Sequence, residues 1–406
     1  MPKNVIVGQS GGPTAVINSS LAGVFQTAQA KGVKHIYGML NGIQGLLDSR
    51  YLDLCEVFTS NLHIELLKRT PSSYLGSCRF KLPTPEQDIR PYQQLFELFK
   101  KLEIGYLFYI GGNDSMDTID KLSKYAETIG SDIRMIGVPK TIDNDLPETD
   151  HTPGFGSAAK YVATTVKELV RDSLVYNEKR LTVVETMGRN AGWLTAATAL
   201  AKCEDNEGVD MIYLPEVPFD MDDFIDRIDK LQKFNPSVVI AVSEGVKLTD
   251  GRYVCELTSS SEYVDSFGHV SLSGAGHYMA NMAAKALKCK ARCVELSTLQ
   301  RCSSHISSLV DTTEAFQVGS AAVQAGFDGK TQQMVTLKRL SNDPYQCTTG
   351  LVPVSAVANK ERIVPLEWID IENVHVKKPF LDYARPLIQA ELTPFFVEGL
   401  PRHIRL

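Results

Sequence analysis

The feature that most constrains the fold is the alternation of short, continuous apolar runs with longer amphipathic segments. The amphipathic segment at 15–30 is predicted to be a helix, and it follows a glycine-rich turn. Apolar runs bounded by turns are typical of strands buried on both faces, and interleaved helices then give a doubly wound α/β fold. The predicted strands lie at 5–7, 106–110, 135–139, 181–185 and 238–242.

Composition narrows the class of protein. The 406 residues are 43% hydrophobic and 22% charged, enough for two domains with their own cores. A net charge of -6 argues against a nucleic-acid partner, so an anionic substrate would need a local basic pocket. No apolar run approaches the roughly 18 residues of a membrane span, and no signal-peptide pattern follows Met1. The eight cysteines form no Cys-x-x-Cys pair, which favours reduced thiols in a cytoplasmic protein.

Two glycine-rich loops, at 8–14 and 111–115, directly follow predicted strands. Ligands of such sheets bind at the carboxyl ends of the strands, where glycines let backbone amides approach a phosphate. Neither loop matches the Walker or dinucleotide patterns, and each is also compatible with a plain turn, with Asp114 as a helix N-cap. The candidate phosphate-binding residues are Gly11, Gly12, Gly112, Asp114 and Ser115.

A third polar loop, at 139–145, places Asp143 and Asp145 two residues apart after a strand. In extended backbone these carboxylates share a face, and they repel each other unless a cation or a proton lies between them. Lys140 beside them favours an anion site, although an Asx-rich turn is the simpler alternative. After a later strand, Arg189 stands where its guanidinium could fork onto a phosphate.

Taken together, these loops resemble the signatures of the phosphofructokinase family. The matching segments occur in the family's order and near its spacing, so the resemblance covers roughly residues 3 to 330. Each motif is weak alone, and the set is specific. The segments are Gly-Gly-Asn-Asp-Ser at 111–115, Pro-Lys-Thr-Ile-Asp-Asn-Asp at 139–145, Val-Val-Glu-Thr-Met-Gly-Arg at 183–189, and two shorter motifs at 75–80 and 299–301.

The resemblance implies an active site in a cleft between two Rossmann-like lobes with mostly parallel sheets, and it implies a role for each residue. Asp143 corresponds to the base that removes the proton of the sugar 1-hydroxyl, and Asp145 to a carboxylate that helps to hold Mg²⁺. Phosphoryl transfer depends on positioning and on cations around the transferred group, and planar arginines suit a sugar phosphate. The implied donor and phosphoryl contacts are Arg79, Arg189, Lys140 and Thr141; the implied contacts to fructose 6-phosphate are Thr141, Asp143, Met187, Gly188, Arg189, Glu244, Arg180, Arg292 and Arg301.

The chain departs from the family pattern at two positions. Asn113 stands where ATP-using relatives carry an aspartate that binds the metal, and an amide oxygen is a weaker ligand for a hard cation. Asn113 is therefore expected to bind the metal only together with Asp145. Thr298 stands near the position of a phosphate-binding histidine, and His305 close by is more typical of a structural histidine.

Asp114 and Lys140 indicate the phosphoryl donor, because both replace glycines of ATP users and so resemble the pyrophosphate-dependent branch. A carboxylate where an α-phosphate would lie fills space and repels charge. Unit charges about 4 Å apart repel by about 1 kcal/mol in water and about 4 kcal/mol near a protein surface. The alternative interpretation is a structural salt bridge between Asp114 and Lys140.

Arg180 and Arg189 flank a strand of about five residues, which spans roughly 16 Å, so both cannot reach one phosphate. In the resembling family, arginines at the positions of Arg180 and Arg292 reach a neighbour's site, which predicts a homo-oligomer, dimer or tetramer, with shared sites. The expected donor lobe is 1–154 plus about 300–345, and the expected sugar-phosphate lobe is 155–299 plus about 346–406.

Two other functions remain open at this point: an ATP-dependent kinase of the same family, and a catalytically idle subunit. The presence of Asp143, Arg79 and Arg189 disfavours the idle subunit. The sequence leaves open whether a seven-carbon sugar phosphate is also a substrate.

Overall fold

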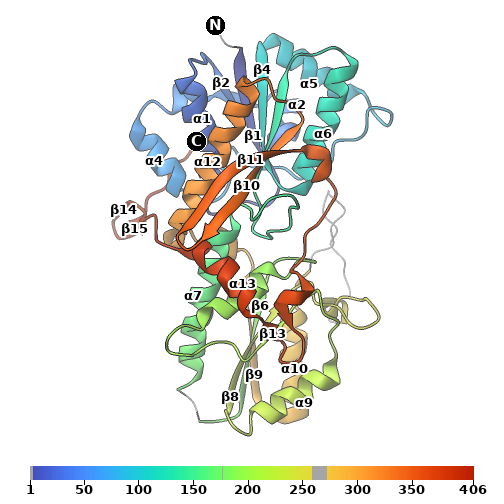
Figure 1. Ribbon diagram of the computed structural model, residues 1–406, viewed down its shortest axis with the longest axis vertical. Helices are drawn as coiled ribbons and strands as arrows, with labels where there is room; N and C mark the ends of the chain where they lie inside the picture. The colour runs from blue at the N-terminus through green and yellow to red at the C-terminus, as the bar shows by residue number, and fades with distance from the viewer. Residues whose placement is uncertain (1–2, 176, 258–271) are drawn as a thin grey trace.

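The computed structural model describes residues 3–175, 177–257 and 272–406, which form two lobes stacked along the long axis (Figure 1). The larger lobe is built on a seven-stranded sheet of order β11-β10-β5-β4-β1-β2-β3. Its central pairs are parallel, and the pairs β2–β3 and β10–β11 at the two edges are antiparallel. The strands are β1 (Asn4–Gln9), β2 (Ile36–Met39), β3 (Tyr51–Asp53), β4 (Ile104–Gly111), β5 (Arg134–Pro139), β10 (Gln333–Asn342) and β11 (Tyr345–Pro353).

Helices cover both faces of this sheet, as the buried strand sequences predict. One apolar core lies between the sheet and α1, α4 and α12, and a second lies between the opposite face and α2, α5 and α6. The helices of this lobe are α1 (Ile17–Ala30), α2 (Gly42–Leu47), α3 (Leu54–Val57), α4 (Asn61–Arg69), α5 (Arg90–Lys101), α6 (Asn113–Thr128) and α12 (Leu309–Phe327).

The smaller lobe holds a four-stranded, fully parallel sheet of order β7-β8-β6-β9. Its helices also lie on both faces, with α7, α8 and α13 on one core and α9 and α10 on the other. The elements are β6 (Arg180–Thr186), β7 (Met211–Tyr213), β8 (Ser237–Ser243), β9 (Lys290–Glu295), α7 (Phe155–Ser173), α8 (Trp193–Ala197), α9 (Met221–Leu231), α10 (Ala275–Leu287) and α13 (Lys378–Ala384).

Short elements complete the chain between and after the lobes. They are α11 (Leu299–Cys302), the 3-10 turns η1 (Thr198–Ala201), η2 (Val254–Leu257), η3 (Ser304–Ile306), η4 (Val354–Ala356), η5 (Leu366–Trp368) and η6 (Arg385–Ile388), and the hairpins β12 (Ile369–Asp370) with β13 (His375–Val376) and β14 (Phe396–Val397) with β15 (Leu400–Pro401).

The predicted α/β fold is confirmed: all five predicted strands lie within β1, β4, β5, β6 and β8, and the predicted helix at 15–30 is α1. The chain enters the smaller lobe at α7, next to the expected division at 154. The expected division near 345 falls where β11 begins. Because β11 pairs with β10, residues 345–353 extend the large sheet.

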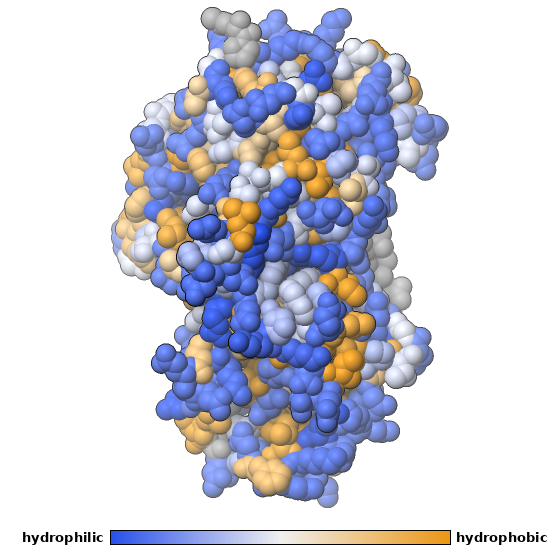
Figure 2. All heavy atoms as spheres, viewed as in Figure 1, coloured by the Kyte–Doolittle hydropathy of each residue, from blue (hydrophilic) through white to orange (hydrophobic). Residues whose placement is uncertain are grey.

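Beyond β11 the chain packs back on both lobes. Residues 359–362, here called the strap, pass from the larger lobe to the smaller one (Figure 1). The last residues return to α4, where the Arg69 side chain donates to Thr393 O at 2.9 Å and the Ile404 amide donates to Thr70 Oγ1 at 3.0 Å. The face seen in Figure 2 is mostly hydrophilic, with hydrophobic side chains in scattered groups.

All eight cysteines are free thiols. No helix in the described ranges is long and apolar enough to cross a membrane.

Candidate active site

A cleft of about 800 Å³ lies between the lobes, at the carboxyl ends of strands from both sheets. The loops after β1, β4 and β5 form one wall, and the loops after β6 and β8 form the other. This is where a doubly wound fold binds its ligands. The predicted site residues that line it are Gly11, Gly12, Arg79, Gly112, Asn113, Asp114, Ser115, Lys140, Thr141, Asp143, Asp145, Met187, Arg189, Glu244 and Arg301.

The loop after β1 brings backbone close to two cations. Gly11 has φ 75°, a left-handed conformation that suits glycine, and its carbonyl accepts a hydrogen bond from Ser77 Oγ at 2.5 Å. A Cβ on Gly11 would lie 3.4 Å from Lys140 Nζ, and one on Gly12 would lie 3.3 Å from Arg301 Nη1. A side chain at either position would therefore crowd one of these two cations.

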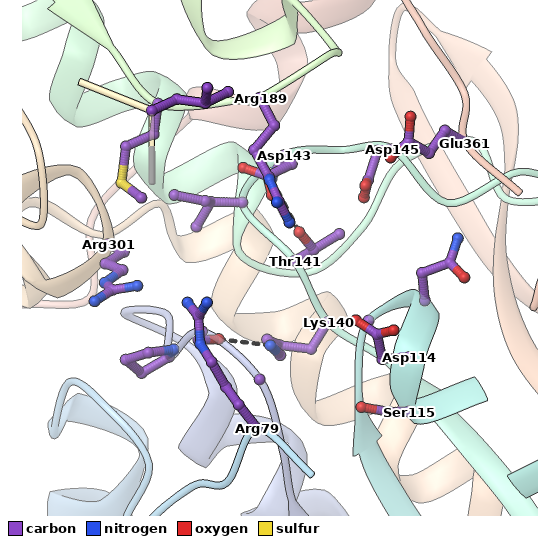
Figure 3. Close-up of a pocket in the computed structure, with 18 of the residues that line it drawn as sticks. Arg79, Asp114, Ser115, Lys140, Thr141, Asp143, Asp145, Arg189, Arg301 and Glu361 are labelled. Carbon is purple, nitrogen blue, oxygen red and sulfur yellow. Dashed lines mark hydrogen bonds between the residues drawn. The ribbon is translucent and has the colours of Figure 1, made fainter. Parts of the chain in front are cut away.

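Lys140 is the most deeply buried cation of the cleft, with 2% of its surface exposed. Burial lowers its pKa to about 8; Asp143 opposes this shift, and Arg301 adds to it. Its ammonium donates to Gly12 O at 2.5 Å, and Figure 3 shows it directed away from Asp114. The carboxylates that act most on its pKa are Asp143 and Asp145, which disfavours the interpretation of Lys140 as a structural partner of Asp114.

The loop after β4 leads straight into α6. Gly112 occupies the N-cap position, so Asp114 lies inside the first turn and the alternative that it caps the helix is wrong. A carboxylate there is favoured by the helix dipole. A Cβ on Gly111 would lie 1.8 Å from Ser115 Oγ, so the tight approach of loop and helix requires glycine.

The loop after β5 carries the paired carboxylates. The Asp143 amide donates to Thr141 Oγ1 at 3.1 Å, which fixes the backbone beside the carboxylate. Burial raises the pKa of Asp143, against the opposing charges of Arg189 and Lys140. Burial also raises the pKa of Asp145 to about 7, and the negative charges of Asp143 and Glu361 add to the shift. A carboxylate with a raised pKa is suited to accept a proton near neutral pH.

The smaller lobe contributes a turn after β6 that is held by Glu244. This carboxylate accepts hydrogen bonds from the amides of Gly188 at 3.3 Å and Arg189 at 3.2 Å. Of the predicted residues in this turn, Met187 and Arg189 line the cleft and Gly188 does not. Burial and the charge of Asp143 raise the pKa of Glu244 to about 8. Figure 3 shows Arg189 beside Asp143, with Arg79 and Arg301 on the opposite side of the cleft.

The expected metal ligands differ in their surroundings. Both polar atoms of the Asn113 amide are engaged by the strap: Oδ1 accepts from the Asn359 amide at 2.5 Å, and Nδ2 donates to Lys360 O. Asp145 faces the cleft near two other acidic groups, which suits a hard cation. The described residues hold no group of three or more His, Cys, Asp or Glu side chains placed for a metal. Mg²⁺ commonly uses only one or two carboxylates and completes its shell with substrate phosphates and water.

Two of the predicted residues lie away from this cleft. Arg180 and Arg292 sit at the amino end of the small sheet, where Arg180 pairs with Lys290 and Thr182 with Arg292. The Arg180 Nε donates to Glu178 Oε1 at 2.8 Å. Within one chain, therefore, only Arg301 of the three expected 6-phosphate arginines reaches the cleft.

The sequence did not predict three polar residues that line the cleft, which are Lys81, Asn359 and Glu361. Lys81 follows Arg79 by two residues in a segment that is neither helix nor strand, and both side chains line the cleft. Asn359 and Glu361 belong to the strap, and no local sequence signal connects them to a loop more than 200 residues earlier.

A half-buried base among cations, in a cleft between two α/β lobes, is the arrangement that phosphoryl transfer requires, and the molecule is a phosphotransferase by class. A family model described as phosphofructokinase matches residues 4–326. The chain belongs to the phosphofructokinase family.

Several relatives are similar over nearly the whole chain. A protein of Halomonas elongata named pyrophosphate–fructose 6-phosphate 1-phosphotransferase is 37% identical over 99% of this chain and 96% of its own length. A protein of Rhodospirillum rubrum with the same name is 40% identical over 95% of this chain and 94% of its own. The crystal structure of a pyrophosphate-dependent phosphofructokinase from Nitrosospira multiformis matches with a TM-score of 0.89 at 37% identity, covering 99% of this chain and 96% of that one.

Proposed function

We propose that this chain transfers a phosphoryl group, reversibly, from pyrophosphate to the 1-hydroxyl of fructose 6-phosphate, giving fructose 1,6-bisphosphate and phosphate. The observation that carries the proposal is the pair Asp114 and Lys140 at the donor loops of a phosphofructokinase cleft. The carboxylate of Asp114 disfavours a nucleotide, because it repels the α-phosphate. Pyrophosphate has no base or ribose for the protein to bind, so the positive charge of buried Lys140 contributes to holding it. The names of the similar proteins support the same reaction.

Five charged groups of the cleft have a step in this reaction. Asp143 accepts the proton of the 1-hydroxyl as the oxygen attacks the nearer phosphorus of pyrophosphate. Arg79 and Arg189 neutralise the oxygens of the transferred group, and Lys140 stabilises the departing phosphate. Asp145 would hold Mg²⁺, which supplies further charge neutralisation when it is bound.

The remaining groups hold the sugar phosphate and set its surroundings. Glu244 and Met187 line the sugar side of the cleft, and Arg301 meets the 6-phosphate from the same chain. We further propose that a neighbouring subunit supplies Arg180 and Arg292, and that the enzyme acts in the cytoplasm in glycolysis or gluconeogenesis.

The test is an initial-rate assay on fructose 6-phosphate with pyrophosphate and ATP side by side, each with and without Mg²⁺. We expect strong preference for pyrophosphate and dependence on the metal. The double variant Asp114→Gly, Lys140→Gly should raise the relative use of ATP and depress that of pyrophosphate. Faster wild-type turnover with ATP would refute the proposed donor, and no turnover with either would favour the idle subunit.

A further inference from the structure

The strap bonds to the loop at 142–150, which carries Asp143 and Asp145, and the reaction above does not use these contacts. It leaves the large lobe after η4 and joins the smaller lobe before η5 (Figure 1). Two of its residues, Asn359 and Glu361, line the cleft. The strap therefore lies beside the reacting groups although it is more than 200 residues from Asp143 in the sequence.

Both ends of the strap are fixed. At the large lobe the Asn113 amide bonds to the backbone of Asn359 and Lys360, and Asn359 Nδ2 donates to Asp117 Oδ1 at 3.0 Å. At the small lobe Trp193 Nε1 donates to Arg362 O at 3.1 Å. Just beyond the strap, Glu216 Oε1 accepts from the Val364 amide at 2.9 Å. These contacts at both ends fix the path of the strap along the cleft.

Arg362 bonds almost entirely to backbone carbonyls of the loop that follows Asp143. Its own amide donates to Asp145 O at 2.7 Å, and its Nη2 donates to Asn144 O at 3.0 Å. Its Nη1 donates to Thr149 O at 2.7 Å and Asp150 O at 2.6 Å. The guanidinium carbon also lies 4.7 Å from the centroid of the Trp193 ring, a cation–π contact.

The loop needs such a partner, because residues 142–150 form neither helix nor strand. Carbonyls in irregular backbone have no ladder to pair with, and buried ones must find donors elsewhere. Asn144 at φ 54° and Glu148 at φ 64° lie in the left-handed region, which asparagine adopts readily but glutamate keeps only when its surroundings enforce it. One arginine fork supplies donors on both sides of this strained stretch.

We infer that Arg362 is a positioning residue of the active site: it braces the backbone from Asn144 to Asp150 and thereby holds Asp143 and Asp145 in their reactive places. The expected effect on kcat rests on the proposed function, whereas the expected effect on the backbone of the loop rests on the contacts alone. Arg362 acts through the loop and does not line the cleft itself. A lysine cannot replace it, because a single ammonium lacks the planar fork that reaches separated carbonyls.

The experiment compares Arg362→Lys with wild type and with Arg402→Lys, a control at an exposed arginine of the same C-terminal segment. We expect Arg362→Lys to lower kcat about 10- to 100-fold, because small misplacement of a catalytic group costs up to about 100-fold. The KM values for both substrates should change less than about threefold, and Arg402→Lys should match wild type.

Hydrogen–deuterium exchange provides a readout that does not depend on the substrate. The amides of Asp143, Asp150 and Thr152 are bonded in the folded loop, so peptides covering 141–152 should exchange faster in Arg362→Lys and at the wild-type rate in Arg402→Lys. Unchanged exchange in a folded Arg362→Lys, or a kcat within threefold of wild type, would overturn the inference. A wild-type enzyme that is inactive with pyrophosphate would refute the proposed function instead. Hydrogen–deuterium exchange would then still test whether Arg362 holds the loop in place. If Arg362→Lys does not fold, Arg362→Gln is measured by the same two readouts.

Discussion

Lys140 shows how a single buried residue can link donor binding to pH. The chain carries a net charge of -6, yet this cleft gathers Lys140, Arg79, Arg189 and Arg301. Burial leaves Lys140 with a pKa of about 8, so the free enzyme keeps the charge only below that pH. A bound phosphate group would restore the proton, because an opposite charge nearby favours the charged form.

We therefore predict that pyrophosphate binding weakens as pH rises through about 8, by up to about tenfold per pH unit, and that it is accompanied by proton uptake near that pH. Lys140→Arg should flatten the profile, since arginine stays charged. Titration calorimetry from pH 7 to 9.5, in two buffers of different ionisation enthalpy, measures both effects. A wild-type affinity that is constant across this range would contradict the prediction.

The lowered pKa of Lys140 also affects folding stability, which changes with pH in the opposite direction to pyrophosphate binding. The unfolded chain keeps the lysine proton up to about 10.5, whereas the folded protein loses it near 8. Between these values the unfolded state binds more protons, so the contribution of Lys140 to stability rises with pH. At neutral pH the buried charge of Lys140 therefore lowers the stability of the folded protein, and the same charge is available to bind the donor.

Asp143 is the second residue whose role has a sharp consequence. As general base it should account for a rate factor of about 10² to 10⁴, and its removal should leave substrate binding nearly intact. We predict that Asp143→Asn loses at least about 99% of kcat with KM values close to wild type. Steady-state kinetics with pyrophosphate measures this directly, and a variant that keeps more than about a tenth of kcat would remove Asp143 from the role.

At the scale of elements, the donor loop depends on the close packing of α1 against α12. A Cβ on Gly319 would lie 2.2 Å from Ser20 O, and one on Gly23 would lie 2.1 Å from Phe316 O. Glycines at both positions let the two helix backbones touch. Because α1 follows the loop that holds Gly11 and Gly12, this contact also fixes the donor wall.

We predict that Gly319→Ala destabilises the folded protein by about 1–3 kcal/mol, the usual cost of overpacking, because the added methyl pushes α12 away from α1. Urea denaturation followed by fluorescence measures the free energy of unfolding. Gln324→Ala, on the exposed face of the same helix, serves as the control and should stay within about 0.5 kcal/mol of wild type. Equal effects of the two substitutions would contradict the packing argument.

Elements also mark the limit of prediction from sequence. The buried strands and the loops after them were predictable, because period and turn chemistry are local, and the loops at 111–115 and 139–145 meet in the cleft as expected. The strap was not, because its contacts join residue 113 to 359 and loop 144–150 to 362. Asn113 illustrates the consequence: the sequence predicts a metal ligand there, and it gives no sign that the Asn113 amide also bonds to the strap.

At the scale of the whole molecule, the small sheet separates two groups of cations. Arg189 follows β6 at its carboxyl end, while Arg180 begins the strand, with Arg292 on the neighbouring strand. Seven residues of strand span about 20 Å, so Arg180 cannot contribute to the cleft of its own chain. If both ends bind the same sugar phosphate, they must do so in different subunits related by a two-fold axis.

We accordingly predict a homo-oligomer, at least a dimer, in which Arg180→Ala raises the KM for fructose 6-phosphate far more than the KM for pyrophosphate. A mixture of Arg180→Ala and Asp143→Asn chains should recover activity, because a hybrid dimer assembles one site with Asp143 from one chain and Arg180 from the other. With random exchange, half of the dimers are hybrid and each has one intact site of two, so about a quarter of wild-type activity should return. Analytical ultracentrifugation and assays after subunit exchange measure both effects, with each variant alone as the control. A fully active monomer, or no recovery once exchange is shown to be complete, would place the 6-phosphate contacts within a single chain.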